Sequence, residues 1–354
     1  MKKKLFTLAL LAMIMVSCTQ DNLEIETDAN RTITVSATMP KTDDDIPKTD
    51  DVYAQTRVSL TPDAETGNYG LDLKWEEDDK LMLCFEKDGT YYHNDAPIVG
   101  SSISNNGKSA QFTITIPTEI PANETFNLYG VYQKENTWTE TNGGYFKDGT
   151  MLYELENSEE ESITLDKMGS YGNGIARPML YFSQANIENS SEPAIAPINL
   201  KHSGWMMALH FKNSSGVEMD MPVSLRLDNP QGTKWAWNGY HGNNGIYFDV
   251  STQAFSYESP TKERDRALWF KINDFGYNWL PLYGQKLAAG ESIVVYRWVA
   301  SLPDVPQLRG EATFRGSIYP ETSTNISPKT VTNGKMYHVY SEWDGNDYKF
   351  VAAY

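Results

Sequence analysis

Residues 71–86 read LDLKWEEDDKLMLCFE, two apolar segments on either side of four consecutive acids. Each apolar segment has the length and the aromatic and aliphatic content of a short β-strand. The acids at 76–79 fall where a turn between strands is expected. This stretch therefore predicts strands at residues 71–75 and 80–86, joined by a turn.

The same pattern continues outward in both directions. Period-two apolar segments alternate with turn residues, and no long stretch keeps the period of a helix. Pairs such as Asp88-Gly89 and Asn333-Gly334 accept the positive φ angles that tight hairpins require. The other expected strands are residues 32–38, 56–60, 111–116, 126–132, 179–183, 206–212, 223–227, 246–250, 293–299, 313–319, 336–342 and 347–353.

This distribution of strands predicts an all-β fold of two tandem antiparallel β-sandwich domains, because the strands divide about evenly between the two halves. Residues 188–197 are rich in Asn, Ser, Glu and Pro and separate the halves. We therefore expect domains at residues 31–190 and 191–354. A leader at 1–17 and an acidic tether at 18–30 precede them.

The leader is basic and then apolar. Lysines at residues 2–4 precede an apolar run at 5–16, which would span about 18 Å as a helix, too short for a bilayer core of about 30 Å. This is typical of a signal peptide. It ends in a segment that resembles a bacterial lipobox, which implies that Cys18 becomes the first residue and carries acyl chains such as palmitate. The alternative is an ordinary secretory signal that happens to contain a cysteine.

Charge and cysteine content exclude several classes of protein. The formal net charge is −17 at pH 7, and an acidic chain repels phosphate backbones, which argues against nucleic-acid binding. Cys18 and Cys84 are the only cysteines, which excludes a disulfide scaffold. Cys84 lies within an apolar strand, as a core residue would.

No motif in the sequence predicts catalysis, a cofactor or a metal site. The acids at 76–79 could suggest the paired carboxylates of a glycosidase, but a turn explains them as well. No nucleophile elbow or phosphate-binding loop is present. The histidines stand alone, outside any zinc-binding spacing, at His93, His202, His210, His241 and His338. We therefore expect a protein that is not an enzyme.

One segment, WAWNGYHGNN at 235–244, is rich in aromatic side chains among Gly and Asn. Flat rings beside amides are what a sugar-binding surface uses, and the candidate glycan-binding residues are Trp235, Trp237, Tyr240 and His241. Alternatively, the two tryptophans cover one end of a sandwich and Asn-Gly closes the turns.

Several short motifs together resemble the Bacteroidales fimbrillin (Mfa-like) lipoproteins. The matching segments that follow the lipobox cysteine are TRVSL at 56–60, LKWEEDDKL at 73–81, RPMLYF at 177–182, LKH at 200–202 and NGKMY at 333–337. The family commonly has glycine where this chain has Asp78. The likeness covers nearly the whole chain after the leader, in motifs that are individually short.

The resemblance implies a fold, a location and a mode of assembly. It implies two transthyretin-like sandwiches in a lipoprotein that reaches the outer membrane and the cell surface, where sibling fimbrial subunits are its partners. In polymerising members a protease cuts after a basic residue and removes an N-terminal strand. The next subunit then fills the open groove with a strand of its own.

Residues 32–38 have the alternation of such a removable strand. A cut after Arg57 would release this strand, whereas a cut after Arg31 would release only the lipid and leave the strand in place. The expected donor is the C-terminal hairpin at 336–354. In an anchor or accessory subunit no cut would occur.

Two functions are therefore open. The first is a structural or accessory subunit of surface fimbriae, anchored by lipid at Cys18 and assembled by strand exchange. The second is a monomeric surface lipoprotein, or a tip adhesin, that binds a host or bacterial glycan through the aromatic residues at 235–241.

Overall fold

The computed structural model describes residues 31–40, 58–62, 69–133, 144–155, 162–164, 179–228, 246–257, 267–273, 282–299, 304–305, 308–314, 317–320, 329–331 and 333–351. All regular secondary structure within these ranges is β-strand, so the predicted all-β class is confirmed. None of these ranges contains a helix long and apolar enough to span a bilayer.

Four sheets contain most strands of the N-terminal half. The largest has the order β13 (Lys201–His202), β11 (Leu180–Glu188), β7 (Thr125–Tyr132), β4 (Lys80–Lys87) and β5 (Thr90–Pro97). A three-stranded sheet consists of β12 (Ile198–Asn199), β1 (Arg31–Thr38) and β6 (Ser109–Ile116). The two smaller sheets consist of β18 (Ala254–Tyr257), β17 (Ile246–Asp249), β9 (Leu152–Glu154) and β8 (Tyr145–Phe146), and of β2 (Val58–Pro62) and β3 (Tyr69–Leu73).

Two larger sheets and two short pairs contain the other strands. One sheet has the order β10 (Ser162–Thr164), β21 (Ser292–Val299), β14 (Trp205–Asn213), β26 (Met336–Trp343) and β27 (Tyr348–Phe350). The other has the order β19 (Ala267–Lys271), β16 (Ser224–Asp228), β23 (Arg309–Phe314) and β24 (Ser317–Pro320). The short pairs are β15 (Met219–Asp220) with β20 (Lys286–Leu287), and β22 (Asp304–Val305) with β25 (Lys329–Thr330).

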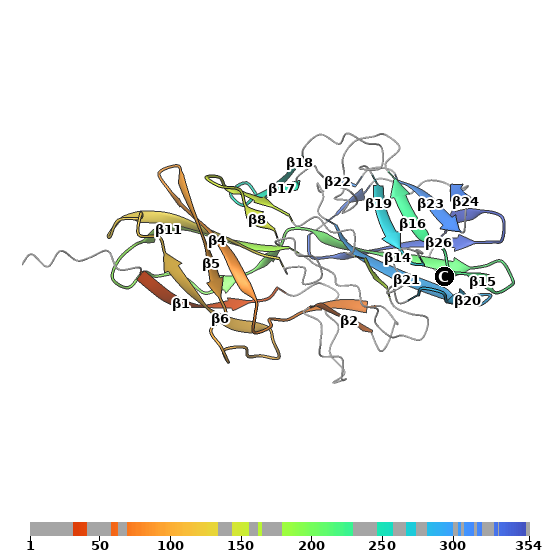
Figure 1. The fold of residues 1–354 in the computed structure, drawn as a ribbon, viewed down its shortest axis with the longest axis horizontal. Helices are drawn as coiled ribbons and strands as arrows, with labels where there is room; N and C mark the ends of the chain where they lie inside the picture. Colours follow the sequence, from red (N-terminus) through yellow and green to blue (C-terminus); the bar gives the residue numbers. More distant parts are fainter. Residues whose placement is uncertain are drawn as a thin grey trace, which may run out of the picture.

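Two hydrophobic cores lie within this arrangement. The first joins side chains of the five-stranded and three-stranded sheets of the N-terminal half, among them Phe85 and Phe112. The second joins side chains of β14, β16, β21 and β27, among them Phe211 and Tyr348. Figure 1 shows the corresponding two groups of strands side by side along the long axis of the molecule.

Strand pairing crosses the expected boundary at residue 190 in both directions. Strands β12, β13 and β17 follow that boundary in sequence but pair with strands of the first half, and β18 pairs with β17 in the same sheet. Strand β10 precedes it and pairs with β21 of the second half. The polar segment at 188–197 therefore connects β11 to β12 within the first group of strands, and the domain limits stay a prediction.

Two of the strand pairs in the described ranges are parallel, where the sequence predicted antiparallel sandwiches. Strand β14 pairs with β26 in parallel over eight residues, and β1 pairs with β12 in parallel at Ala37 and Thr38. Parallel neighbours need a long connection, and in both cases much of the chain lies between the two partners. Hairpin signals in the sequence cannot reveal such pairs.

The predicted hairpin signals have mixed outcomes. Asp88 and Gly89 have φ angles of 50° and 79° and join β4 to β5, so this hairpin is confirmed. The single strand predicted at 313–319 is wrong, because β23 ends at Phe314 and β24 begins at Ser317, and the two pair with each other. Both halves of that segment contain apolar side chains, so the sequence pattern does not separate the two strands.

The last of the four acids at 76–79 stabilises a turn. Asp79 is buried; its Oδ2 accepts a hydrogen bond from the Glu76 amide at 2.8 Å, and its Oδ1 accepts one from the Tyr132 hydroxyl at 3.1 Å. The ring of Trp75 lies edge-on to Tyr132 at 4.9 Å between centroids. The predicted turn is confirmed, and Asp79 fixes it to the core.

Replacing Asp79 with alanine should lower the free energy of unfolding by about 1–3 kcal/mol, since a buried hydroxyl and a backbone amide lose their acceptor. Urea unfolding measures the change. The neighbouring Glu77→Ala, at an exposed position, should change it by about 0.5 kcal/mol or less. Equal effects of the two substitutions would contradict this role for Asp79.

Three of the segments that carry the family resemblance meet at His202. The residue pairs with Leu180 of β11, and the amide of Ser203 donates to the carbonyl of Met179 at 3.1 Å. Gly334, with φ +80°, lies against the ring, where a Cβ atom would be 2.8 Å from His202 Cδ2. Glycine is needed at this position for both its φ angle and its size.

Candidate strand-exchange site

Strand β1 has a complete sheet partner on one side only. It pairs antiparallel with β6 over eight residues, from Arg31 opposite Ile116 to Thr38 opposite Ser109. On its other side, within the described part of the chain, only Ala37 and Thr38 pair with β12. Most of β1 is thus an edge strand, which Figure 1 shows in red at the border of the first group of strands.

The side chains of β1 alternate as the sequence predicted. Val35 and Ala37 are buried in the first core, and Ile33 is partly buried against it. Thr32, Thr34 and Ser36 are exposed, as expected for a strand with one face toward a core. The expectation that Ile33, Val35 and Ala37 share one face is confirmed.

An apolar strip of β6 lies beside these residues. Ala110, Phe112, Ile114 and Ile116 are all buried, and the first three lie opposite Ala37, Val35 and Ile33. Loss of β1 would uncover this strip together with the backbone N–H and C=O groups of β6. An apolar groove bordered by unpaired backbone groups is a template for an added strand.

Both ends of β1 are attached to other parts of the fold. At the C-terminal end, the carbonyl of Thr38 accepts a hydrogen bond from the Leu200 amide at 3.2 Å, and the Met39 amide donates to the Lys108 carbonyl at 2.9 Å. At the N-terminal end, the Arg31 guanidinium donates to Asn189. A protease would have to detach Arg31 from both Asn189 and β6 before cutting after it.

Several predicted site residues lie outside the described residues. They are Cys18, Arg57, Trp235, Trp237, Tyr240 and His241. Lipidation at Cys18, cleavage after Arg57 and glycan binding by the aromatic residues therefore stay predictions.

The expected donor hairpin is built into the second core. Strand β26 lies between β14 and β27, and its Trp343 is buried. Tyr348 of β27 has no exposed surface, and its ring centroid lies 6.2 Å from that of Phe211. A donor strand from this end must either leave its own core or consist of the residues that follow β27.

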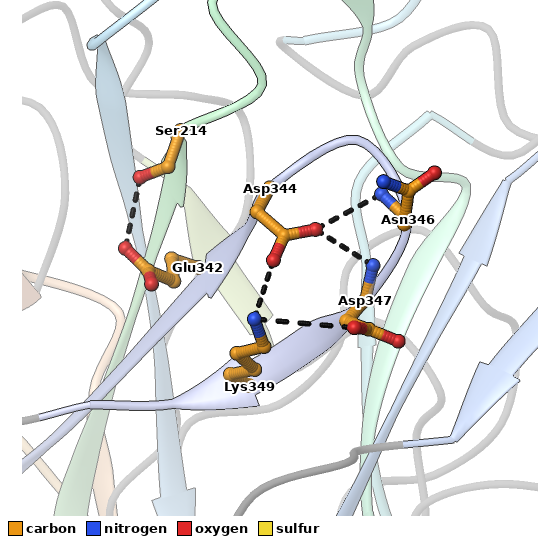
Figure 2. Close-up of polar contacts among 6 residues, drawn as sticks. All are labelled: Ser214, Glu342, Asp344, Asn346, Asp347 and Lys349. Carbon is orange, nitrogen blue, oxygen red and sulfur yellow. Dashed lines mark hydrogen bonds and ion pairs between the residues drawn. The ribbon is translucent and has the colours of Figure 1, made fainter.

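The turn between β26 and β27 is held by one carboxylate, as Figure 2 shows. Asp344 Oδ1 accepts hydrogen bonds from the amides of Asn346 at 3.0 Å and Asp347 at 2.8 Å. Its Oδ2 contacts the ammonium group of Lys349, and this contact, with the two amides, lowers the pKa of Asp344 to about 2. The acids at 344–347 thus form a hydrogen-bonded turn.

Two of the histidines that stand apart in the sequence are neighbours in the fold. His210 of β14 and His338 of β26 lie with Nε2 and Nδ1 2.9 Å apart, and His210 stacks on Tyr340 at 4.2 Å. They are distant in the sequence, and the parallel pairing of β14 with β26 brings them together. Among the described residues, no group of three or more metal-binding side chains forms.

No protein-family model matches the chain, and no curated protein matches it. Among solved structures, one match is a candidate cell adhesion protein of Bacteroides uniformis, with 12% identity, coverage of 78% of this chain and 91% of that one, and a TM-score of 0.41. A candidate adhesin of Bacteroides thetaiotaomicron has 8% identity, coverage of 77% and 86%, and a TM-score of 0.36. The tip fimbrial protein Mfa3 of Porphyromonas gingivalis has 10% identity, coverage of 78% and 94%, and a TM-score of 0.31.

Proposed function

We propose that the chain is a structural or accessory subunit of a surface fimbria, exported as a lipoprotein anchored through Cys18 and assembled by strand exchange. The observation that carries the proposal is the position of β1. This strand lies beside an apolar strip of the first core, yet among the described residues most of its length has a sheet partner on one side only. A body of this kind has no need of catalytic groups, and its partners are other subunits.

A single cut would separate β1 from the rest of the fold. Arg57 directly precedes β2, which begins at Val58. Cleavage after Arg57 leaves β1 held only by noncovalent contacts, and its loss opens the strip on β6 to another strand. While β1 is in place the subunit has no vacancy to fill, which would keep it monomeric during export.

The groove restricts which strand can replace β1. Ala37 is fully buried opposite Ala110, so a donor must place a small side chain there and a larger apolar one two residues earlier, at the position of Val35. The C-terminus offers this spacing in Val351-Ala352-Ala353. This agreement in spacing supports the C-terminal segment as the donor.

Two truncated forms of the chain test the proposal. The form comprising residues 58–354 lacks β1 and should polymerise into ladders on gels run without boiling, whereas the form comprising residues 31–354 should stay monomeric. Circular dichroism establishes that each form is folded. A folded 58–354 form that remains monomeric in size-exclusion chromatography would contradict strand exchange.

A synthetic peptide of residues 31–40 tests whether the groove accepts β1 when it is added separately. Added to the 58–354 form, it should occupy the groove and suppress polymerisation, because it restores the apolar contacts of Val35 and Ala37. The same peptide with Val35→Asp should not suppress it, since a carboxylate would be buried against Phe112. Equal suppression by both peptides would contradict occupancy of this groove.

A further inference from the structure

We infer that Arg31 and Asn189 form a latch that keeps β1 in its groove after the chain has been cut, so that cleavage and strand release are separate steps. The biological use of this latch rests on the proposed fimbrial function. The latch itself is a property of the fold and can be tested without assembly.

The latch is a charged, two-acceptor contact between residues far apart in sequence. The guanidinium of Arg31 donates from Nη1 to the backbone carbonyl of Asn189 and to its side-chain Oδ1, the latter at 2.9 Å. Hydrogen bonds from a charged donor are stronger than those between neutral groups. Arg31 is the first residue of β1, so the contact lies at the N-terminal end of the strand, next in sequence to the predicted tether at 18–30.

Asn189 is a rigid anchor for the arginine. Only 4% of its surface is exposed, and its Nδ2 donates to the carbonyls of Ile120 at 2.7 Å and Pro121 at 3.2 Å. Its own amide donates to the Glu124 carbonyl at 2.8 Å. Because Nδ2 is used in this way, Oδ1 must point toward Arg31, and the anchor cannot follow the strand if the strand moves.

The position of the latch gives it control over release. Apart from β6, the described residues hold β1 at its two ends, through Asn189 at Arg31 and through β12 at Ala37 and Thr38. Strands separate most easily from an end, because each step then breaks few contacts. Without the latch, the end next to the tether would fray and peel away from β6.

The same contact shields Arg31 from proteolysis. A trypsin-like protease must take the arginine side chain into its own pocket, and here that side chain is bound to Asn189 while the backbone is paired with β6. The latch therefore directs cutting toward the basic residues after β1, of which Arg57 is one. A cut there leaves the latched strand in place until it is released.

The release of the cut strand can be measured directly. The protein for this experiment comprises residues 19–354, with the recognition site of a specific protease inserted in the segment 41–51 and a fluorophore on the N-terminus. After the protease has cut it, the loss of fluorescence from the folded body is followed over time. Arg31→Ala should speed release on the order of 10-fold, because a charged hydrogen bond is lost. Thr34→Ala, at an exposed position of the same strand, should change the rate by less than about 2-fold.

Two results would overturn the latch. One is equal release from the Arg31→Ala and Thr34→Ala proteins. The other is cutting after Arg31 by trypsin, in the uncut native protein, as fast as in a peptide of the same sequence. The fimbrial proposal fails separately: if Arg31→Ala speeds release but no form of the chain polymerises, the latch stands and strand-exchange assembly does not.

Discussion

Replacing Tyr348 with alanine should lower the free energy of unfolding by about 3–5 kcal/mol. The side chain has no exposed surface, and it packs among Phe211, Phe350 and the backbone of Gly310. A Cβ atom on Gly310 would lie 2.8 Å from the Tyr348 ring, so the ring rests directly on that strand. Truncation leaves a cavity that a rigid sheet cannot close. Urea unfolding of residues 31–354 measures the loss.

Tyr145 is the matched control, because it is the same residue type with 52% of its surface exposed. Its hydroxyl donates to Glu154 Oε2 at 2.8 Å in an exposed position, and such a bond contributes about 1 kcal/mol or less. The free energy of unfolding of Tyr145→Ala should therefore be close to that of the unmodified protein. Similar losses of unfolding free energy in the two variants would contradict the conclusion that core packing of Tyr348 stabilises the fold.

This prediction decides how the donor strand can be tested. A deletion of residues 347–354 would remove Tyr348, so any loss of polymer would report unfolding of the second core. A deletion of 352–354 keeps β27 and removes the Ala353 that would occupy the Ala37 position in a neighbour. If the shorter deletion leaves the free energy of unfolding unchanged but abolishes the polymer, the polymer has been lost because the donor is missing.

Local features of the fold follow from the sequence. The alternation of Ile33, Val35 and Ala37 and the hairpin at Asp88-Gly89 depend on residues that are close together in the chain. The acids at 76–79 mark a turn for the same reason. Local patterns do not identify the partner of a strand, because many apolar strands have equivalent patterns. The parallel pair of β14 and β26 is of this kind.

The candidate site was predicted in part. The sequence identifies the strand that covers the groove, since its alternation is intact, but it assigns Arg31 only as a position for cleavage. Asn189 reads as a linker residue because Ser, Glu and Pro follow it. Its burial depends on the loop at Ile120 and Pro121, far away in sequence, which supplies acceptors for its amide. A contact made by tertiary packing leaves no local signal.

Acidification from pH 7 to pH 4 should destabilise the fold through His202 by up to about 3 kcal/mol. The pKa of His202 is lowered from 6.5 to about 4, first because burial disfavours the charged ring and second because Lys108 repels it. Only 8% of the residue is exposed. The unfolded chain binds this proton at a higher pH than the folded chain does. The stabilisation by the neutral ring is therefore complete above about pH 6.5 and is lost as the pH falls toward 4.

Substituting His202 with glutamine separates this effect from the titration of the acids. Free energies of unfolding at steps between pH 4 and 7.5 should show a slope that is smaller by up to about 1 kcal/mol per pH unit in the variant. The acids titrate in both proteins, so the difference between the two curves isolates the histidine. Lost packing beside Gly334 would shift the whole variant curve downward and leave its slope unaffected. His210→Gln should act in the same direction, because burial and His338 also lower the pKa of His210 to about 4. Parallel curves for wild type and His202→Gln would show that His202 is protonated equally in both states, and hence that the junction where Leu180, His202 and Gly334 meet is open to water.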